Sequence, residues 1–289
     1  MDGRIDHVTI AGSDLDTLTA TVETVGLATE YGGVHDNGIT HMSVLGFDDG
    51  SYIELIATVE GADEAPMWTE YIATDAGPAA WAMEVDDIAR TAKAGVEAGV
   101  KIEGPTYMTR ERPDGTLLEW DLVHIGEAAE REKLPFFITD RTPRIERVSP
   151  TAGVAGGPLT GVAEVIIAVD SIDAATRQFD RLFRYPTPET DHAEQLDTTV
   201  ASFPGKPVTL ATPADGAGRL ADRLDHLGEA PCAYLLGTDD FDAAREAYQL
   251  TEPSTWFGTD VAWFDADPFT GRADRAARAV AARLGRLFA

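Results

Sequence analysis

Cysteine is almost absent from this 289-residue chain, which contains only Cys232. A single thiol excludes an intramolecular disulfide and any zinc site built on several cysteines. Histidine, aspartate and glutamate are therefore the side chains left to hold a metal ion.

Long apolar runs are also missing. No stretch approaches the roughly 18 residues of a membrane-spanning helix, and the N-terminal sequence MDGRIDHV lacks the features of a signal peptide. The hydrophobic fraction of 44% is that of a globular protein. We therefore expect a cytoplasmic protein with no membrane partner, folded as one large domain or two ordinary ones.

Basic residues are few, with 23 Lys and Arg against 50 Asp and Glu, so the net charge is −27. Such a surface repels the phosphate backbone, and we expect no nucleic-acid partner. The acidic residues are dispersed along the chain, a composition that resembles proteins of salt-loving archaea. There, ionic screening weakens the mutual repulsion of the carboxylates.

A short apolar strand followed by an Asp or Ser N-cap and an amphipathic helix recurs four times. The equivalent apolar residues at the helix starts are Leu15, Ile88, Ile172 and Phe241. Strand-like pieces with Gly-containing turns follow the first three helices and close with SYIELIA, TLLEWDLV and KPVTLAT. The fourth unit is expected to be truncated.

These units predict an α+β fold of tandem βαβββ modules, in which four modules pair into two cupped mixed sheets with outer helices. A Pro- and Gly-rich junction predicts a first domain over 1–145 and a second, diverged domain over 160–270. Residues 271–289 carry five arginines in an Ala-rich pattern. This pattern predicts a C-terminal helix that docks on the body or on a second subunit, so a homodimer stays open.

Four motifs, IDHVTIAGSDLDTL, GGVH followed by GITH, SYIELI and LPFFITDR, carry a family resemblance. They resemble the glyoxalase-like branch of the vicinal oxygen chelate superfamily, which includes glyoxalases, extradiol dioxygenases and antibiotic-sequestering proteins. The resemblance covers residues 4–140 well and residues 160–266 more faintly. It implies a small-molecule substrate and a divalent ion in the cup, either zinc, manganese, iron, nickel or cobalt.

The resemblance implies His7, Glu54 and Glu119 as the metal ligands, because the metal is held from the first and last strands of paired units. Strand alternation independently predicts that these side chains point away from the helix-packed side. A lone carboxylate on an apolar strand is costly unless it binds a metal or pairs with an arginine such as Arg110 or Arg112. In the second half, the matching positions form no metal-binding set: Glu164, Thr209 and Ala233.

Glu119 and His35 are the expected catalytic side chains, with His35 placed near the cup mouth by the tight turn after it. The residues expected to bind substrate are His41, Tyr52, Trp120 and Phe137. A surface position for His35 and a core position for the aromatic residues are the alternatives.

Ala80 stands where a dioxygenase of this superfamily has a second histidine. The resemblance therefore favours a metal-dependent lyase or isomerase that acts on a small substrate with vicinal oxygens. Two alternatives stay open: a metal-free protein that sequesters a small molecule, and an extradiol-type dioxygenase.

Overall fold

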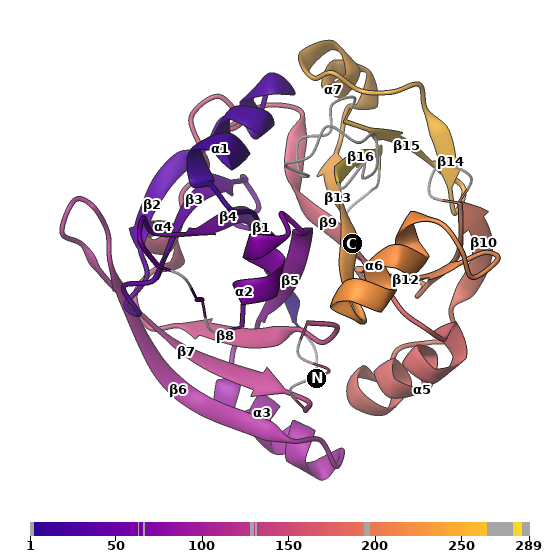
Figure 1. The fold of residues 1–289 in the computed structure, drawn as a ribbon, viewed down its shortest axis with the longest axis horizontal. Helices are drawn as coiled ribbons and strands as arrows, with labels where there is room; N and C mark the ends of the chain where they lie inside the picture. Colours follow the sequence, from indigo (N-terminus) through magenta and orange to yellow (C-terminus); the bar gives the residue numbers. More distant parts are fainter. Residues whose placement is uncertain are drawn as a thin grey trace.

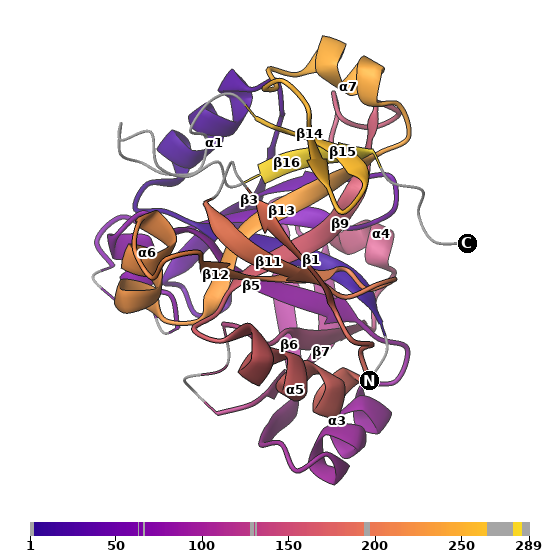
Figure 2. The same cartoon turned by 90° about the vertical axis from the view of Figure 1, so that its right-hand side faces the viewer.

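Two mixed eight-stranded sheets with the same topology make up the fold, and helices lie around them (Figures 1 and 2). The structure is a computed structural model that describes residues 3–62, 64–65, 67–127, 130, 132–193, 197–264 and 280–284. The predicted α+β class with four βαβββ modules is confirmed. Among the described helices, none has both the length and the apolar character to cross a bilayer.

The first sheet has the strand order β2-β3-β4-β1-β5-β8-β7-β6. Its strands are β1 (Arg4–Ala11), β2 (Glu30–Val34), β3 (Thr40–Gly46), β4 (Tyr52–Thr58), β5 (Gly77–Glu84), β6 (Ile102–Glu111), β7 (Leu117–Ile125) and β8 (Phe136–Asp140). The first strand of each module runs parallel to the last, β1 with β4 and β5 with β8, while β1 and β5 join the modules antiparallel.

The second sheet repeats this order as β10-β11-β12-β9-β13-β16-β15-β14. Its strands are β9 (Leu159–Ala168), β10 (Glu189–Ala193), β11 (Thr198–Ser202), β12 (Val208–Pro213), β13 (Ala230–Thr238), β14 (Ser254–Trp256), β15 (Thr259–Trp263) and β16 (Val280–Leu284).

The four module helices begin at the residues that the repeat predicts. They are α1 (Leu15–Thr24), α3 (Ile88–Glu97), α5 (Ile172–Phe183) and α7 (Phe241–Ala247), and each N-cap side chain accepts a backbone N–H in the first turn. Their apolar faces, including Leu15, Leu18 and Phe179, join one core with the outer face of the strands. The shorter helices are α2 (Thr69–Ala73), α4 (Arg144–Arg147) and α6 (Arg219–Leu227).

The last module is complete, so the expected truncation is wrong. Residues 280–284, predicted as part of a C-terminal helix, form β16 instead, which pairs with β13 and β15 where β8 lies in the first sheet. Pairing on both edges outweighs the helical preference of this Ala-rich segment. The other residues of 271–289 lie outside the described residues, and the second sheet reaches beyond the predicted boundary at 270.

The two halves are joined by buried contacts around β1 and β5. The Tyr234 hydroxyl of β13 lies 2.9 Å from the carbonyl oxygens of both Thr9 and Ala80. Arg223 of α6 donates to the carbonyl oxygens of Ala76 and Pro78. The second half therefore supports the backbone of the strands at the centre of the first sheet.

The first sheet curls until its two edge strands meet. Arg110 of β6 donates to the Gly32 carbonyl oxygen of β2, and the Thr109 hydroxyl donates to Asp36 over 2.6 Å. Figure 1 shows β6 rising along the outside of this cup toward β2. The concave face is consequently enclosed on the side of this seam.

Candidate functional site

The concave face of the first sheet carries polar side chains from its central strands. His7 and Thr9 of β1 are opposite Tyr52 and Glu54 of β4. The alternate residues, among them Val8, Ile53 and Trp81, enter the apolar core under the helices. His7 and Glu54 therefore lie inside the cup, as strand alternation predicts.

Glu54 is the centre of this cluster and is 8% exposed. Its Oε2 accepts the Thr9 hydroxyl at 3.0 Å and its Oε1 lies 3.1 Å from His35 Nε2. Burial raises the pKa of Glu54, but the hydrogen bond and charge of His35 and the charge of His7 outweigh it and lower the pKa to about 2. Glu54 is therefore ionised at neutral pH.

His35 is the most accessible member, with 26% of its side chain exposed. Because ionised Glu54 only accepts hydrogen bonds, His35 Nε2 must carry a proton. Its Nδ1, 2.8 Å from Thr40 Oγ1, accepts the threonine hydroxyl when the ring is neutral. The turn at Asn37, whose side chain accepts the backbone N–H of Thr40, places His35 at this position.

His7 is held in the opposite tautomer. Its Nδ1 lies 2.6 Å from Asp6 Oδ1, while its Nε2 lies 3.8 Å from Glu54 Oε2, too far for a hydrogen bond. The ring stacks on Tyr52 at 4.5 Å between centroids and meets the edge of Phe136 at 5.4 Å. A β-bulge between Ile5 and His7 lets the neighbouring residues Asp6 and His7 contact each other.

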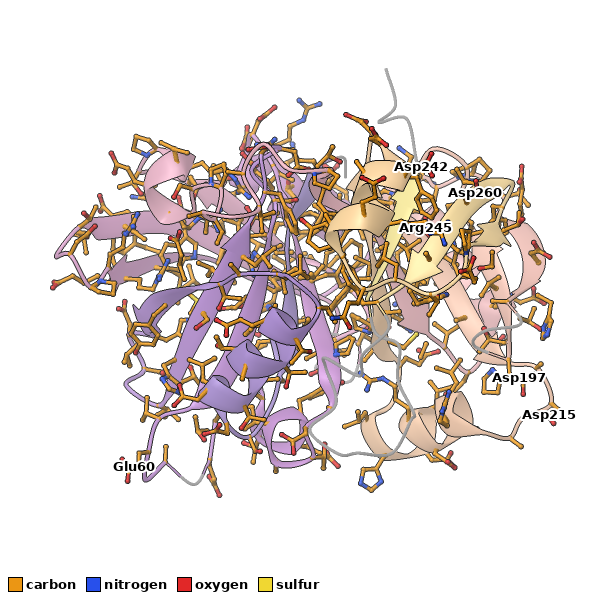
Figure 3. All side chains as sticks on the ribbon, turned by 90° about the horizontal axis from the view of Figure 1, so that it is seen from above. Glu60, Asp197, Asp215, Asp242, Arg245 and Asp260 are labelled. Atoms are coloured by element: carbon orange, nitrogen blue, oxygen red, sulfur yellow. The ribbon has the colours of Figure 1, made fainter. Side chains whose placement is uncertain are left out.

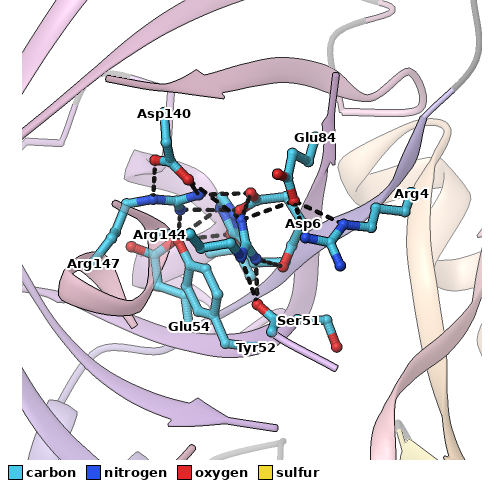
Figure 4. A network of polar contacts seen from close by, with 12 residues as sticks. Arg4, Asp6, Ser51, Tyr52, Glu54, Glu84, Asp140, Arg144 and Arg147 are labelled. Atoms are coloured by element: carbon cyan, nitrogen blue, oxygen red, sulfur yellow. Dashed lines mark hydrogen bonds and ion pairs between the residues drawn. The ribbon is translucent and has the colours of Figure 1, made fainter. Parts of the chain in front are cut away.

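Asp6 is fully buried and is surrounded by cations (Figure 4). Arg147 of α4 donates to both of its oxygens, at 3.0 and 2.7 Å, and to both oxygens of Asp140. Arg144 also donates to Asp6. Burial raises the pKa of Asp6, but the charge of Arg147 and the hydrogen bond from His7 hold it well below its usual value.

Ionised Asp6 accepts the Nδ1 proton of His7, so in the neutral ring Nε2 carries the lone pair and lies 3.8 Å from Glu54 Oε2. Two electron-rich groups at 3.8 Å favour a positive charge between them. A proton taken up by Nε2 supplies that charge.

Glu119 is not part of this cluster. It lies on β7, separated from β1 by β5 and β8, and it accepts a hydrogen bond from Tyr107 of the edge strand β6. It shares its strand face with Val123, which packs in the core under the helices. The predictions of Glu119 as metal ligand and catalytic residue are therefore wrong.

Glu119 was misassigned because the alignment of the two modules in the sequence was shifted by one strand. The last strand of the second module is β8, not the segment TLLEWDLV, which forms β7. Thr9 is opposite Glu54, and the equivalent Ala82 is opposite Phe136. Phe136 therefore occupies the position in the second module that is equivalent to Glu54 and that was expected for Glu119. Its side chain has no atom that can bind a metal ion.

The predicted three-ligand metal centre does not fit the residues present. Catalytic zinc sites have three protein ligands. Here only His7 Nε2 and the Glu54 carboxylate offer a lone pair to a metal ion. His35 instead directs an N–H group at Glu54. Within the described ranges, no group of three or more His, Cys, Asp and Glu side chains is arranged to hold a metal ion.

Two predicted substrate contacts lie on the wrong face of their strands. His41 is opposite Ala57 of the helix-side core, and its ring lies 6.1 Å from the exposed Tyr31. Phe137 is fully buried in that core, and its neighbour Phe136 is the residue that contacts His7. Adjacent residues of a strand face opposite sides, so an error of one position reverses the assignment.

The other two aromatic residues lie on the concave side. Tyr52 is buried and its hydroxyl lies 2.9 Å from Arg147 Nη1. Trp120 is half-buried and shares its strand face with His124, whose ring lies 5.5 Å from Phe136. Tyr52 thus supports the cluster, and Trp120 lines the cup farther along β7.

Sequence reasoning missed Asp6, Arg144 and Arg147. The neighbouring letters of IDHV give no sign of the bulge, and RTPRIERV reads as a linker. The spacing of the two arginines, three residues apart on one helical face, is the signal that could have indicated a common partner.

The second cup has different chemistry at the same positions. Glu164, equivalent to His7, accepts hydrogen bonds from the Thr209 hydroxyl at 2.6 Å and from Trp256 Nε1 at 3.0 Å. Ala233 is a buried core residue there. The imidazole cluster is therefore a property of the first cup.

Comparison with protein families matches residues 5–183 to the family described as glyoxalase-like domain, more than half of the chain. The chain belongs to this family. No curated protein matches the sequence.

Three solved structures show the same fold. A hypothetical protein from Staphylococcus aureus has a TM-score of 0.59 and 15% identity and covers 98% of both chains. A mutant 4-hydroxymandelate synthase from Streptomyces coelicolor has a TM-score of 0.59 and 12% identity, covering 98% of this chain and 92% of its own. A xylose isomerase-like TIM barrel/4-hydroxyphenylpyruvate dioxygenase fusion protein has a TM-score of 0.58 and 13% identity, and this chain matches 50% of it.

Proposed function

We propose that the first cup is the active site of an enzyme that moves a proton on a small molecule with neighbouring oxygens, in the isomerase or lyase class. The observation that supports it most is the His7 ring, with Nδ1 held by Asp6 at 2.6 Å and Nε2 lying 3.8 Å from Glu54 Oε2. A buried carboxylate that fixes the tautomer of a histidine is the arrangement of a general base.

In this proposal His7 Nε2 removes a proton from a carbon beside a carbonyl group, and the electron pair moves onto the carbonyl oxygen. Glu54, 3.8 Å away, stabilises the imidazolium. Returning the proton to the neighbouring carbon completes an isomerisation, as the hydroxyl oxygen on the deprotonated carbon passes its own proton to the former carbonyl oxygen and becomes the new carbonyl oxygen. His35 keeps Glu54 ionised and forms the accessible side of the cluster, and no step requires a metal ion.

Exchange of substrate protons with solvent tests the proposal. The protein is incubated in D₂O with small 2-hydroxyketones and 2-oxoacids, and deuterium uptake is followed by proton NMR with and without a chelator. We expect exchange that the chelator leaves unchanged, that His7→Gln abolishes, and that the matched His41→Gln on the outer face retains. Exchange that survives His7→Gln, or that needs an added divalent ion, contradicts the proposal.

A metal-free binding protein is the second candidate. The stacked Tyr52 and the edge of Phe136 bury His7 between aromatic rings, which also suits the holding of a molecule without chemistry. Compounds that raise the melting temperature without any deuterium uptake would favour this candidate.

A further inference from the structure

Arg110 is a buried cation of the first cup whose partners differ from those of the other arginines nearby. It is 3% exposed, and its Nη1 donates to the Gly32 carbonyl oxygen while Nη2 lies 3.5 Å from the Arg147 carbonyl oxygen. Both partners are neutral. Among the described residues, no carboxylate lies within ion-pair distance of Arg110.

The carboxylates of the cup are already held by other groups. Asp6 and Asp140 are paired with Arg147, and Glu54 is bound by Thr9 and His35. Burying a guanidinium without an anionic partner is unfavourable. Burial lowers the pKa of Arg110, whereas Tyr52 and Glu54 act in the opposite sense, so the cation interacts electrostatically with the cluster.

Arg110 makes fewer hydrogen bonds at its seam than Arg223 makes where the two halves meet. Arg223, which joins the two halves, donates to three carbonyl oxygens, those of Ala76, Pro78 and Pro231, while its Nε has no hydrogen-bond partner among the described residues. Arg110 has two, and one of these is at the limit of hydrogen-bond distance. A guanidinium offers five N–H donors in a planar fork, so donors remain for a further acceptor.

We propose that Arg110 binds an anionic oxygen group, a carboxylate or a phosphate, of the small molecule that reacts at His7. The planar fork matches two oxygens of either group. In a chain with a net charge of −27, an anionic substrate needs such a local cation. This inference rests on the proposed function and adds the substrate class to it.

Calorimetric titration of the full chain with oxalate and with inorganic phosphate tests the assignment. We expect the unaltered protein to bind at least one of the two anions. Binding of oxalate but not phosphate would identify a carboxylate as the recognised group, and binding of phosphate but not oxalate would identify a phosphate. Arg110→Gln weakens binding by about tenfold or more, the effect of losing a charged hydrogen bond. Arg110→Lys retains part of the affinity, and Arg141→Gln, an exposed arginine paired with Asp121, retains all of it.

His7→Gln separates this inference from the proposed function, because it retains anion binding while proton exchange is lost. Absence of binding by the unaltered protein, or equal binding by Arg110→Gln, overturns the assignment. If Arg110→Gln does not fold, a crystal structure of the unaltered protein with oxalate or phosphate decides. An anion on the Arg110 guanidinium supports the proposal, and an anion found only elsewhere overturns it.

Discussion

At the scale of single residues, the contact between Asp6 and His7 determines what the imidazole can do. Asp6→Asn keeps the size of the side chain but removes the negative charge that holds the proton on Nδ1. We expect the Nδ1–H tautomer of His7 to lose population and proton exchange to fall by roughly a hundredfold or more. Nitrogen-15 NMR of the histidines measures the tautomer directly.

His41 is the internal reference in the same spectra, because it lies on the other side of the sheet. An Asp6→Asn protein with the native His7 tautomer and full exchange would show that Asp6 serves packing alone. A change at His7 without a change at His41 separates positioning from general loss of structure.

Glu54 makes stability depend on pH in acid. Its pKa in the folded protein is about 2, below the value of 4.5 for a free side chain. The contribution of the carboxylate is therefore fully present above pH 4.5 and is lost as the pH falls toward 2. Its upper size is about 3 kcal/mol, since each pKa unit corresponds to about 1.4 kcal/mol.

Urea unfolding of the unaltered protein and of Glu54→Gln, measured across this range, checks the prediction. We expect the stability difference between them to shrink as the pH falls, because the amide does not titrate. A difference that is constant between pH 5 and pH 2.5 would contradict it.

Single residues were predictable from the sequence where the pattern was local. Strand alternation was enough to place His7 and Glu54 on the concave face, and the residues after His35 were enough to predict the turn. The predictions for Glu119 and Phe137 were wrong because they needed the register of strands that are distant in the sequence. An error of one position in that register reverses the face on which a side chain lies. Asp6 failed because a bulge has no signature in the letters IDHV.

At the scale of elements, the short helix α4 is the feature that the sequence disguised. Its residues read as a linker, yet its arginines enter the cup and neutralise Asp6 and Asp140. Strand β16 is the converse case, because an Ala- and Arg-rich segment favours a helix in isolation and forms a strand between two others. In both cases, contacts with distant parts of the chain determine the structure and role of the segment more than its local sequence does.

Removal of the Arg147 side-chain charge should therefore destabilise the whole first half. Arg147→Met leaves Asp6 and Asp140 buried with fewer partners, and we expect a loss of about 3–5 kcal/mol in the free energy of unfolding. Arg141→Met is the matched control, because Arg141 makes an exposed pair with Asp121 that contributes about 1 kcal/mol or less. Equal losses in urea titrations would contradict the role of α4.

At the scale of the whole molecule, the repeat that the helix caps reveal produces two sheets of one topology with different interiors. The sequence predicted this division correctly, because the caps and apolar spacings are local. It could not predict that Tyr234 and Arg223 of the second half bind the backbone of β1 and β5. These contacts join segments more than 140 residues apart in the sequence.

The net charge of −27 also acts on the whole molecule. Exposed acidic residues lie at the rim of both halves, among them Glu60, Asp197, Asp215, Asp242 and Asp260 (Figure 3). Salt shortens the screening length from about 10 Å at 0.1 M to about 3 Å at 1 M, so repulsion between these carboxylates weakens as salt rises.

We expect 2 M KCl to raise the free energy of unfolding in urea by at least about 1 kcal/mol over 0.1 M KCl. The Arg147→Met protein should gain as much as the unaltered protein, because a buried ion pair is screened much less than an exposed one. A stability that is flat or falls with KCl would show that the acidic surface is not an adaptation to salt.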